Sequence, residues 1–571
     1  MTYFRAVSAT VTGILVFFLG VLGAAYYQWG REPGVTKGSI LQVHLEGAML
    51  EYPPGGFTTG LLVSESPTLH TVLDNLSKAA VDRRVTGVLF VLDGPAAGYG
   101  MLEELRAGIR KVRDAGKPVW AWSDNLTLKD LYIAAACDSF FIHPSGYIYL
   151  GGMYADRMYL AGTLEKLGIE PQLARIESYK SAAELMMRKD MSPQDREMMG
   201  WILGDIYPRV LEETASGLGV GSVDLERAME RALLTPEDLV SRGLADGVRQ
   251  WDEMKGALPR PKGKDKPIFL ASADYDGIRA DKVGLKGKHK IAVVHAQGMI
   301  GGDESGMDPL FGITMGQASV NRDLQKALDD DDVIGVVFRV DSRGGEGITS
   351  DRISRMVEIV DREKPVVASM VDVAASGGYN ISYRARKILA DGHTITGSIG
   401  SITGKFTLRD FYNRLGVTKD GLGQGPNADF YSDYRKWSDE EYARLVEDHW
   451  AGYNTWVRDI ARFRKLEPAA VDSAGRGRVW TGRQAKERKL VDGLGTLDDA
   501  VAAVKEAAGL DADEKVTLVH YPQPEGILAS ILGMEITAIP EVLAVRWTRA
   551  QVDRWGSWSR AEFRILDVPL P

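Results

Sequence analysis

The sequence predicts an α/β protein built from two tandem copies of one domain and preceded by one transmembrane helix. Three observations carry this prediction. The chain matches itself at a nearly constant spacing, apolar strand-like runs alternate with amphipathic helix-like stretches, and a long uncharged run lies near the N-terminus. With 571 residues, 44% of them hydrophobic and 26% charged, the chain has the composition of a folded globular protein.

The self-match indicates a duplication of a whole domain. Residues 85–93 (VTGVLFVLD) match residues 333–341 (VIGVVFRVD), 248 positions later. Near the end of each copy, residues 244–247 (LADG) match residues 490–493 (LVDG), 246 positions later. Because the spacing drifts so little along the chain, a tandem duplication explains the matches better than chance does.

Each copy shows the alternation that is typical of α/β domains. Short runs rich in Val and Ile predict buried parallel strands at residues 88–92 and 119–122 of the first copy, and at 336–340 and 366–371 of the second. Amphipathic stretches predict helices over 101–115 and 350–362, between these strands. Strands that alternate with helices predict a mainly parallel sheet in each copy.

The predicted organisation has five parts. These are an N-terminal membrane anchor (1–30), the first copy (38–258), a linker (259–289), the second copy (290–510) and a C-terminal extension (511–571). A Pro- and Lys-rich stretch opens the linker and marks the boundary between the copies. Two apolar segments of the extension, 527–532 and 536–545, predict an amphipathic element that docks on the protein or on a membrane surface.

The anchor is predicted from residues 6–27, which carry no charge. As a helix this run is about 33 Å long, enough to cross a hydrocarbon core of about 30 Å. Arg5 precedes the run, so we expect the N-terminus inside the cell and the bulk of the chain on the exported side. A cleaved signal peptide is the alternative, but the run is long for a signal-peptide core.

Composition excludes several function classes. The net charge of −9 argues against general nucleic-acid binding, which needs a concentrated basic face. Cys137 is the only cysteine, so no intrachain disulfide and no cysteine-based zinc cluster can form. The eight histidines form no local metal or catalytic motif, and His44 and His295, at matched strand positions, are interpreted as structural. The sequence therefore predicts no cofactor and no metal site.

A candidate nucleophile lies where the two copies differ. Ser376 follows a buried strand, stands before Gly377 and Gly378, and precedes a helix-like stretch, 380–386. The matched position in the first copy is Lys129, for which we expect no catalytic role. Free amides at a helix start and glycines that let a carbonyl approach suit a nucleophile, whereas a simple helix N-cap is the alternative role for this serine.

Two further features complete a candidate site. The Gly344-Gly345 turn, at the end of a strand, can direct a backbone N–H at an oxyanion together with Gly377, although an ordinary turn has the same signature. No Gly-x-Ser-x-Gly motif is present, which leaves a lysine base as one option. Lys180 is the candidate because its counterpart region has no lysine, but the residues alone do not distinguish it from other lysines.

Four motifs together resemble a known family. They are ASGGY (375–379), TGSIG (396–400), YKSA (179–182) and VWTG (479–482). They are similar to the signal peptide peptidase A (protease IV) family, peptidase family S49, in its long, duplicated bacterial form. The resemblance spans residues 38–510 and includes the N-terminal anchor.

The resemblance implies a ClpP/crotonase-like fold and a membrane-bound serine protease without a cofactor. It implies hydrolysis of signal peptides left in the membrane, a homotetramer, and a bacterial inner-membrane location with the catalytic domains on the periplasmic side. By motif position, Ser376 matches the nucleophile, Lys180 the general base and Ser398 the serine that orients this lysine. The resemblance also implies that the oxyanion hole is formed by the amides of Gly344 and Gly377. Nucleophile and base then come from different copies.

One position departs from the family pattern. The family usually has Ser-Pro-Gly-Gly where this chain has Ser342-Arg343-Gly344-Gly345. Arg343 leaves the turn without the rigidity of proline, which weakens the assignment of Gly344.

Three alternative functions remain open at this point. The chain can be a protease of other membrane or exported peptides, a crotonase-type acyl-CoA enzyme on the same fold, or a non-catalytic membrane scaffold. A lysine base adds one requirement to the protease: Lys180 must be neutral, so Glu177 and Glu184 are expected to point away from it.

Overall fold

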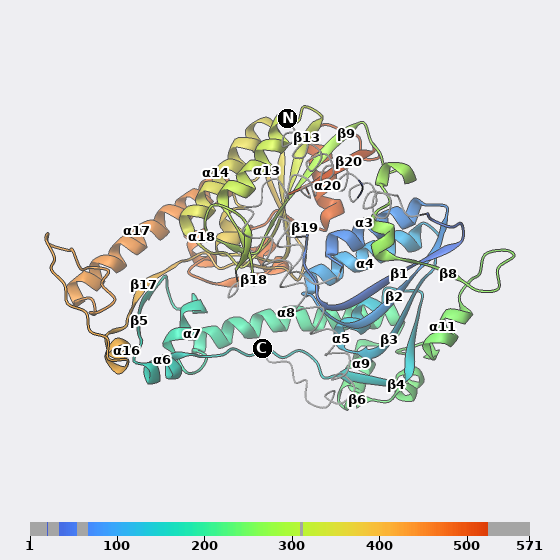
Figure 1. Ribbon diagram of the computed structural model, residues 1–571, viewed down its shortest axis with the longest axis horizontal. Helices are drawn as coiled ribbons and strands as arrows, with labels where there is room; N and C mark the ends of the chain where they lie inside the picture. Colours follow the sequence, from blue (N-terminus) through green and yellow to red (C-terminus); the bar gives the residue numbers. More distant parts are fainter. Residues whose placement is uncertain (1–19, 21–33, 54–66, 309–311, 524–571) are drawn as a thin grey trace, which may run out of the picture.

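The fold is built on two similar main sheets, each covered by helices (Figure 1). The structure is a computed structural model, which describes residue 20 and residues 34–53, 67–308 and 312–523. In the view of Figure 1 the sheet of the second copy lies at the top centre and that of the first copy at the right. Helix α8 (Pro193–Leu218) runs along the lower side and contacts both copies.

The first copy supplies eleven consecutive helices and strands before α8 and seven after it, among the described residues. Before α8 these are β1 (Ser39–Ala48), α3 (Leu69–Val81), β2 (Val85–Ala96), α4 (Tyr99–Asp114), β3 (Val119–Leu126), α5 (Leu128–Ala134), β4 (Ser139–Leu150), α6 (Ala161–Leu167), β5 (Glu170–Arg175), the 3₁₀ turn η1 (Ser181–Ala183) and α7 (Glu184–Met187). After α8 come α9 (Ser222–Met229), β6 (Ala232–Leu234), α10 (Pro236–Ser241), β7 (Gly247–Val248), α11 (Trp251–Ala257), β8 (Ile268–Ala271) and α12 (Ser272–Asp276).

The second copy repeats this order with variations. After η2 (Ala280–Val283) it contains β9 (His289–Gln297), β10 (Met299–Ile300), β11 (Gly306–Asp308), β12 (Gly312–Met315), α13 (Gln317–Asp329), β13 (Val333–Ser342), α14 (Gly347–Glu363), β14 (Val366–Ala375), α15 (Gly377–Asn380), β15 (Lys387–Ala390), β16 (Ile395–Gly397) and β17 (Ile402–Thr407). It ends with α16 (Arg409–Arg414), α17 (Asp439–Arg464), α18 (Pro468–Ala474), β18 (Val479–Thr481), α19 (Gly482–Glu487), β19 (Gly493–Leu494), α20 (Leu497–Ala507) and β20 (Val516–Tyr521).

The two main sheets have corresponding strand orders. The first runs β6-β4-β3-β2-β1-β8 and the second β18-β16-β14-β13-β9-β20. Pairing within each is parallel except at one edge, where β6 and β18 are antiparallel to their neighbours. The predicted α/β class and the duplication are therefore confirmed, as are the four predicted strands.

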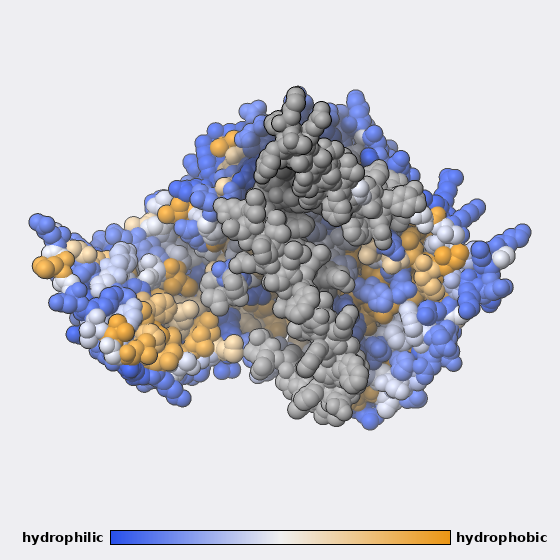
Figure 2. Space-filling view, in the orientation of Figure 1, coloured by the Kyte–Doolittle hydropathy of each residue, from blue (hydrophilic) through white to orange (hydrophobic). Residues whose placement is uncertain are grey.

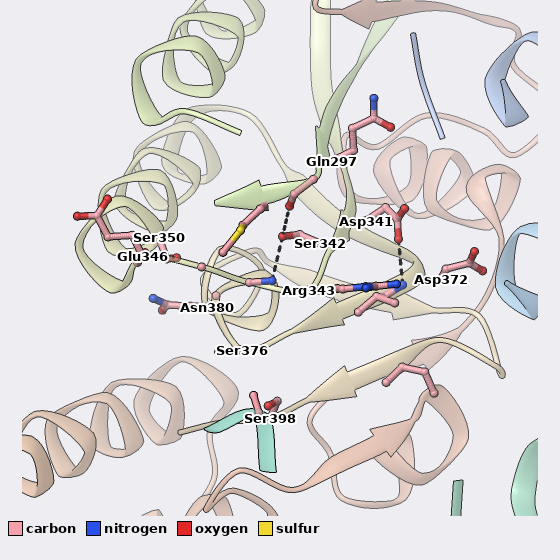
Figure 3. A pocket seen from close by; sticks show the side chains of 18 of the residues that line it. Gln297, Asp341, Ser342, Arg343, Glu346, Ser350, Asp372, Ser376, Asn380 and Ser398 are labelled. Carbon is pink, nitrogen blue, oxygen red and sulfur yellow. Dashed lines mark hydrogen bonds between the residues drawn. The ribbon is translucent and has the colours of Figure 1, made fainter. Parts of the chain in front are cut away.

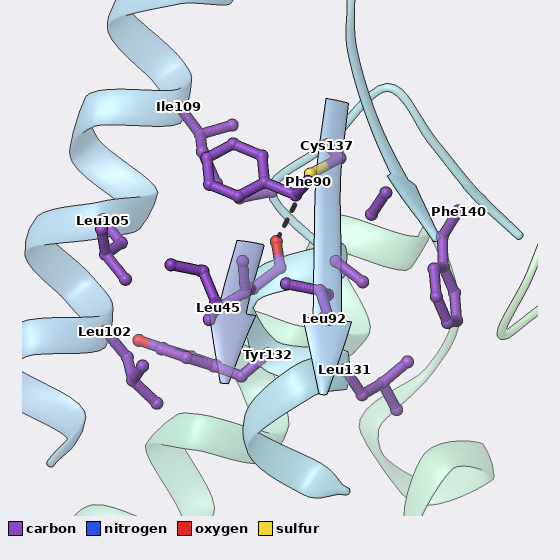
Figure 4. Packing of buried hydrophobic residues seen from close by; sticks show 14 of the residues in the cluster. Leu45, Phe90, Leu92, Leu102, Leu105, Ile109, Leu131, Tyr132, Cys137 and Phe140 are labelled. Atoms are coloured by element: carbon purple, nitrogen blue, oxygen red, sulfur yellow. Dashed lines mark hydrogen bonds between the residues drawn. The ribbon is translucent and has the colours of Figure 1, made fainter. Parts of the chain in front are cut away.

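The hydrophobic core of each copy lies between its sheet and its helices. In the first copy, strand residues such as Phe90 and Leu92 pack against Leu102, Leu105 and Ile109 of α4 (Figure 4). These side chains are completely buried, and apolar residues three and four positions apart place them on one face of the helix. Burial of this face holds the helix on the sheet.

Two details differ from the sequence predictions. The helix expected over 380–386 is instead the single turn α15, which starts earlier, at Gly377. Beyond it the amides of Ser382 and Ala385 bond to carbonyls three residues back, and the Ser382 hydroxyl donates to Gly378 O, so the chain continues as turns.

The second difference concerns the sheet edges. Strand β8 comes from the stretch expected to be a linker, and β20 comes from the expected C-terminal extension. Each adds in parallel to the first strand of a copy, β8 to β1 and β20 to β9. Both strands satisfy backbone groups that a sheet edge otherwise leaves unpaired.

Among the contacts between the copies are a strand pair and a buried ion pair. Strand β5 of the first copy pairs antiparallel with β17 of the second, from Glu170 opposite Thr407 to Arg175 opposite Ile402. The buried ion pair is formed by Arg339 on β13 of the second copy, whose side chain is completely buried.

The Arg339 guanidinium donates to carboxylates of the first copy, Glu51 and Glu104, each at 2.8 Å. Although burial raises the pKa of Glu51, Arg339 and His295 outweigh this effect and lower that pKa to about 2.

The predicted anchor, residues 1–30 apart from residue 20, and the apolar segments 527–532 and 536–545 lie outside the residues that the structure describes. Within the described ranges, none of the helices combines the length and the apolar character that crossing a bilayer requires.

We expect Arg339→Ala to destabilise the protein by about 3–5 kcal/mol, because it leaves two buried carboxylates without their cation. Urea unfolding of the purified chain measures this change. Arg362→Ala is the control, since Arg362 pairs with Glu358 at the surface and its loss costs at most about 1 kcal/mol. Equal stabilities of the two variants would contradict this account of the contact between the copies.

Candidate active site

Ser376 stands between strand and helix, as the sequence predicts. It follows β14 and precedes α15, and its backbone has φ 57° and ψ −115°. This left-handed conformation is costly for a residue with a side chain. Two hydrogen bonds maintain it, because the Ser376 amide donates to Gly397 O on β16 and the Ser376 carbonyl accepts from Asn380 N. Ser376 and Ser398 thus lie at the ends of neighbouring strands, β14 and β16 (Figure 3).

Lys180 reaches this position through the pairing of β5 with β17. It lies five residues beyond β5, on the first copy, and Ser398 lies four residues before β17, on the second. Gly477 of the second copy packs against the Lys180 backbone so closely that an added Cβ would lie 2.3 Å from Lys180 N. The adjacent Arg478 guanidinium lies over the Tyr179 ring, 4.1 Å from its centroid. The second copy therefore fixes the backbone that carries Lys180.

The structure brings the predicted nucleophile and base together within a single chain. Lys180 Nζ lies 3.0 Å from Ser376 Oγ, 2.8 Å from Ser398 Oγ and 2.9 Å from Ser398 O. A neutral amine has two N–H donors and one lone pair. If the donors go to the two Ser398 oxygens, the lone pair is left for the proton of the Ser376 hydroxyl. Both oxygens of Ser398 thus lie within hydrogen-bond distance of the amine.

Burial sets the protonation of this amine. Lys180 is only 5% exposed, and burial alone lowers the pKa of its ammonium group to about 7. The neighbouring carboxylates point elsewhere, as expected: Glu177 pairs with Arg476 at 3.3 Å and Glu184 with Arg175 at 2.5 Å. About half of the lysine is therefore neutral at pH 7.

The oxyanion assignment changes at one of its two amides. The Gly377 N–H, at the start of α15, has no hydrogen-bond partner among the described residues. Gly344 N–H, which was predicted as the second donor, already donates to Ser342 Oγ at 3.1 Å. The next amide, Gly345 N–H, has no partner within the described ranges and lies 3.1 Å from where a Cβ of Gly377 would be. Gly345 therefore replaces Gly344 as the candidate donor.

The turn that carries these glycines is held firmly without the family's proline. Ser342 Oγ donates to Gly298 O at 2.6 Å while it accepts from Gly344 N (Figure 3). The Gly344 carbonyl also accepts from Ile300 N at 3.0 Å. Gly344 has φ 98°, and a Cβ there would lie 2.6 Å from Gly377 N, so the close contact of the two turns requires glycine.

The corresponding turn of the first copy serves the contact between the copies instead. The amides of Gly98 and Met101, at the start of α4, donate to the Asp372 carboxylate of the second copy at 2.7 and 2.8 Å. Lys129, the counterpart of Ser376, donates to Ala97 O at 2.7 Å. Asp341 lies next to Asp372. Burial is the main cause that raises the pKa of Asp341 to about 7, and the negative charge of Asp372 raises it further.

A cleft of about 1670 Å³ opens onto Ser376 and Lys180. Both copies line it with apolar side chains, including Met49 and Ile206 from the first and Ile395 from the second. Its lining residues include no group of three converging metal ligands among the described residues. The arrangement can hold an extended chain against a hydroxyl, an amine and two free amides, which is what acyl transfer requires.

Sequence reasoning missed three of the residues that build this site. Gly477 and Asp372 act through contacts with the other copy, and Gly345 was part of the predicted glycine turn but was not chosen as its donor. The Gly475-Arg-Gly477 spacing was the available signal for a tight backbone approach.

Comparisons with known proteins agree with the motifs. The sequence profile described as "Peptidase family S49" matches residues 111–262 and 358–511, one stretch in each copy. "Serine protease SPPA, chloroplastic" of Arabidopsis thaliana is 31% identical over 543 residues, which cover 92% of this chain and 79% of that protein. "Protease 4" of Salmonella typhi is 29% identical over 563 residues, covering 93% of this chain and 89% of that one.

Among solved structures, a point mutant of ClpP1 from Listeria monocytogenes matches 37% of this chain and 94% of its own. Its TM-score is 0.24 and its sequence identity 15%.

We expect one lysine to titrate near pH 7. NMR of the protein labelled with ¹³C at lysine Cε measures each lysine pKa, and burial of Lys180 predicts about 7 against an ordinary 10.5. The resonance should disappear in Lys180→Met. A spectrum in which this resonance titrates above about 9 would contradict the buried, neutral amine.

Proposed function

The chain belongs to peptidase family S49 and is a serine protease, and from this premise we propose that Ser376 is its nucleophile and Lys180 its general base. The observation that carries the proposal is the 3.0 Å separation of Lys180 Nζ from Ser376 Oγ, between groups of different copies. Ser398 orients the amine, and the amides of Gly377 and Gly345 form the oxyanion hole.

In the first step, Ser376 Oγ attacks the carbonyl carbon of a peptide bond while its proton passes to Lys180 Nζ. The carbonyl oxygen becomes an oxyanion and accepts hydrogen bonds from the N–H groups of Gly377 and Gly345. The C–N bond then breaks, the Lys180 ammonium gives its proton to the leaving amine, and an ester on Ser376 remains.

In the second step, a water molecule replaces the leaving amine. Lys180 Nζ, again neutral, takes one proton from the water as its oxygen attacks the ester carbonyl. The same two amides stabilise the second oxyanion, and its collapse returns the Lys180 proton to Ser376 Oγ. The net reaction consumes one water per peptide bond and leaves the enzyme unchanged.

We propose that the substrates are apolar peptides, and signal peptides left in the membrane in particular. The support is the apolar lining that both copies give to the cleft, including Met49, Ile206 and Ile395. A relative from Enterococcus faecium, 34% identical over 215 residues, is named "Putative signal peptide peptidase SppA". Other membrane or exported peptides are the second candidate, because the same apolar lining accepts them.

The membrane location is part of the same proposal. Residues 1–30 would anchor the chain in the bacterial inner membrane, with the catalytic copies on the periplasmic side and lipid as a partner. The uncharged run at 6–27 supports it.

We also propose a homo-oligomer, with the tetramer that the resemblance implies. The support is a group of exposed apolar residues at one end of the molecule, over α6 and α16, which includes Leu160, Leu167 and Leu415 (Figure 2). Exposed apolar patches of this kind mark contact surfaces.

We also take the fold type of the two copies from the family resemblance. We propose two ClpP/crotonase-like copies, within 38–258 and 290–510, each completed by the edge strand β8 or β20. The support is the equal strand order of the two sheets and the turn from β14 to α15 at Ser376. Family membership and the assembled Ser–Lys pair favour the protease over an acyl-CoA enzyme and over a non-catalytic scaffold.

We expect Ser376→Ala and Lys180→Met each to lower kcat/KM for a fluorogenic peptide by about 10⁴-fold or more, since each removes an essential partner of one proton transfer. Lys129→Met is the matched control, because Lys129 occupies the position of Ser376 in the first copy, and it should stay within about 2-fold of the wild type. Circular dichroism checks that all three variants are folded. Residual activity above about 10% in either site variant would exclude its assigned role.

The substrate preference has its own test. We expect an apolar signal peptide to be cleaved with a kcat/KM at least about 10-fold higher than the same peptide with serines in its apolar core, because the cleft buries apolar side chains. Mass spectrometry of the products measures both rates, with Ser376→Ala as the blank. Equal rates would contradict the preference and leave the catalytic roles intact.

A further inference from the structure

Three histidines from distant parts of the chain meet where the two copies join. His70 lies on α3 of the first copy, His295 on β9 of the second and His520 on the edge strand β20. Their ring nitrogens all lie within 4.8 Å of one another. None of the three lines the catalytic cleft, so the mechanism proposed above does not use them.

The two histidines on the strands present ring nitrogens to each other at hydrogen-bond distance. His295 Nε2 lies 2.9 Å from His520 Nδ1, so the two nitrogens face each other. The other nitrogen of His295, Nδ1, lies 3.4 Å from Glu51 Oε1 and has no hydrogen-bond partner among the described residues. A metal-binding histidine typically directs its second N–H at a carboxylate in this way.

The carboxylate behind His295 is itself fixed. Glu51 is 2% exposed, and its Oε1 accepts from Arg339 Nε at 2.8 Å. The Tyr52 ring stacks on His295, with 3.8 Å between the ring centroids and 12° between the planes. The orientation of the His295 ring is therefore set before any ligand binds, which lowers the cost of forming a site.

The third histidine is close enough to join them. The His70 ring centroid lies 4.0 Å from that of His520 and 5.7 Å from that of His295. Ligand nitrogens about 2.0–2.1 Å from a tetrahedral zinc ion are about 3.4 Å apart. The ligand nitrogens of the three rings lie within 4.8 Å of one another, and His70, half-buried on the first turn of α3, can approach the other two by rotation about its side-chain bonds.

We propose that His70, His295 and His520 form a binding site for a divalent transition-metal ion of the zinc class, with Glu51 orienting His295. Three imidazoles suit Zn²⁺ and its neighbours and leave a fourth coordination position for water. The ion links α3 of the first copy to β9 and β20 of the second. It also stabilises one wall of the cleft, because Met49 and Leu50, which line the cleft, directly precede Glu51.

The duplication provides a matched control for this site. His44 occupies on β1 the position that His295 occupies on β9, but it is exposed. Across the sheet His44 faces Val91, whereas His295 faces Arg339. The first copy therefore has the equivalent histidine without the ion pair that would orient it.

The experiment uses the full chain after dialysis against a chelator. Calorimetric titration with Zn²⁺ should give one tight site per chain, and Co²⁺ should give the visible absorption bands of a tetrahedral nitrogen-ligated ion. We expect His70→Ala and His295→Asn to weaken Zn²⁺ binding by more than the roughly 10- to 100-fold that loss of an orienting partner costs. His44→Ala should bind Zn²⁺ as the wild type does.

Two results would overturn the proposal. The first is a wild-type chain that binds no stoichiometric Zn²⁺. The second is a His70→Ala variant that binds Zn²⁺ and Co²⁺ as tightly as His44→Ala does. His70 is half-buried, so this comparison stands even where His295→Asn fails to fold.

Discussion

Lys180 Nζ reaches Ser376 Oγ because strands β5 and β17, one from each copy, pair along their whole length. This pairing carries a lysine of the first copy into the interior of the second, where burial makes its charged form costly. A pKa lowered from 10.5 to about 7 corresponds to about 5 kcal/mol. The neighbouring carboxylates Glu177 and Glu184 pair with arginines instead of with this amine.

The two copies therefore depend on each other for chemistry and for stability. In the proposed mechanism the second copy supplies the nucleophile and the oxyanion amides, and its Gly477 packs against the Lys180 backbone. In the same mechanism the first copy supplies the base, and the amide of Gly98, in its equivalent turn, donates to the Asp372 carboxylate of the second copy. Arg339 adds a buried ionic contact between them. Each copy has specialised, and neither holds a complete site.

Local pattern and internal repetition were enough to predict the fold class, the duplication and the strands that carry the site. Ser376 was predictable because a strand followed by Ser-Gly-Gly is a local signal, and Lys180 and Ser398 followed from the family motifs. Gly345 was missed because the choice between adjacent amides depends on the hydrogen bond from Gly344 N to Ser342 Oγ. The three clustered histidines were missed because they are separated by more than 200 positions. The pairing of β20 with β9 brings His520 to His295, and His70 joins them from α3.

The most direct test of the account is the pH dependence of the reaction of Ser376 with a serine-directed fluorophosphonate, followed by mass spectrometry of the labelled peptide. A neutral Lys180 activates the hydroxyl, so the labelling rate should rise through an apparent pKa of about 7 and level off above about pH 8. The rise should be absent in Lys180→Met, which should label at a rate at least about 100-fold lower. A rate that does not change between pH 6 and 9, or equal labelling in Lys180→Met, would contradict the account.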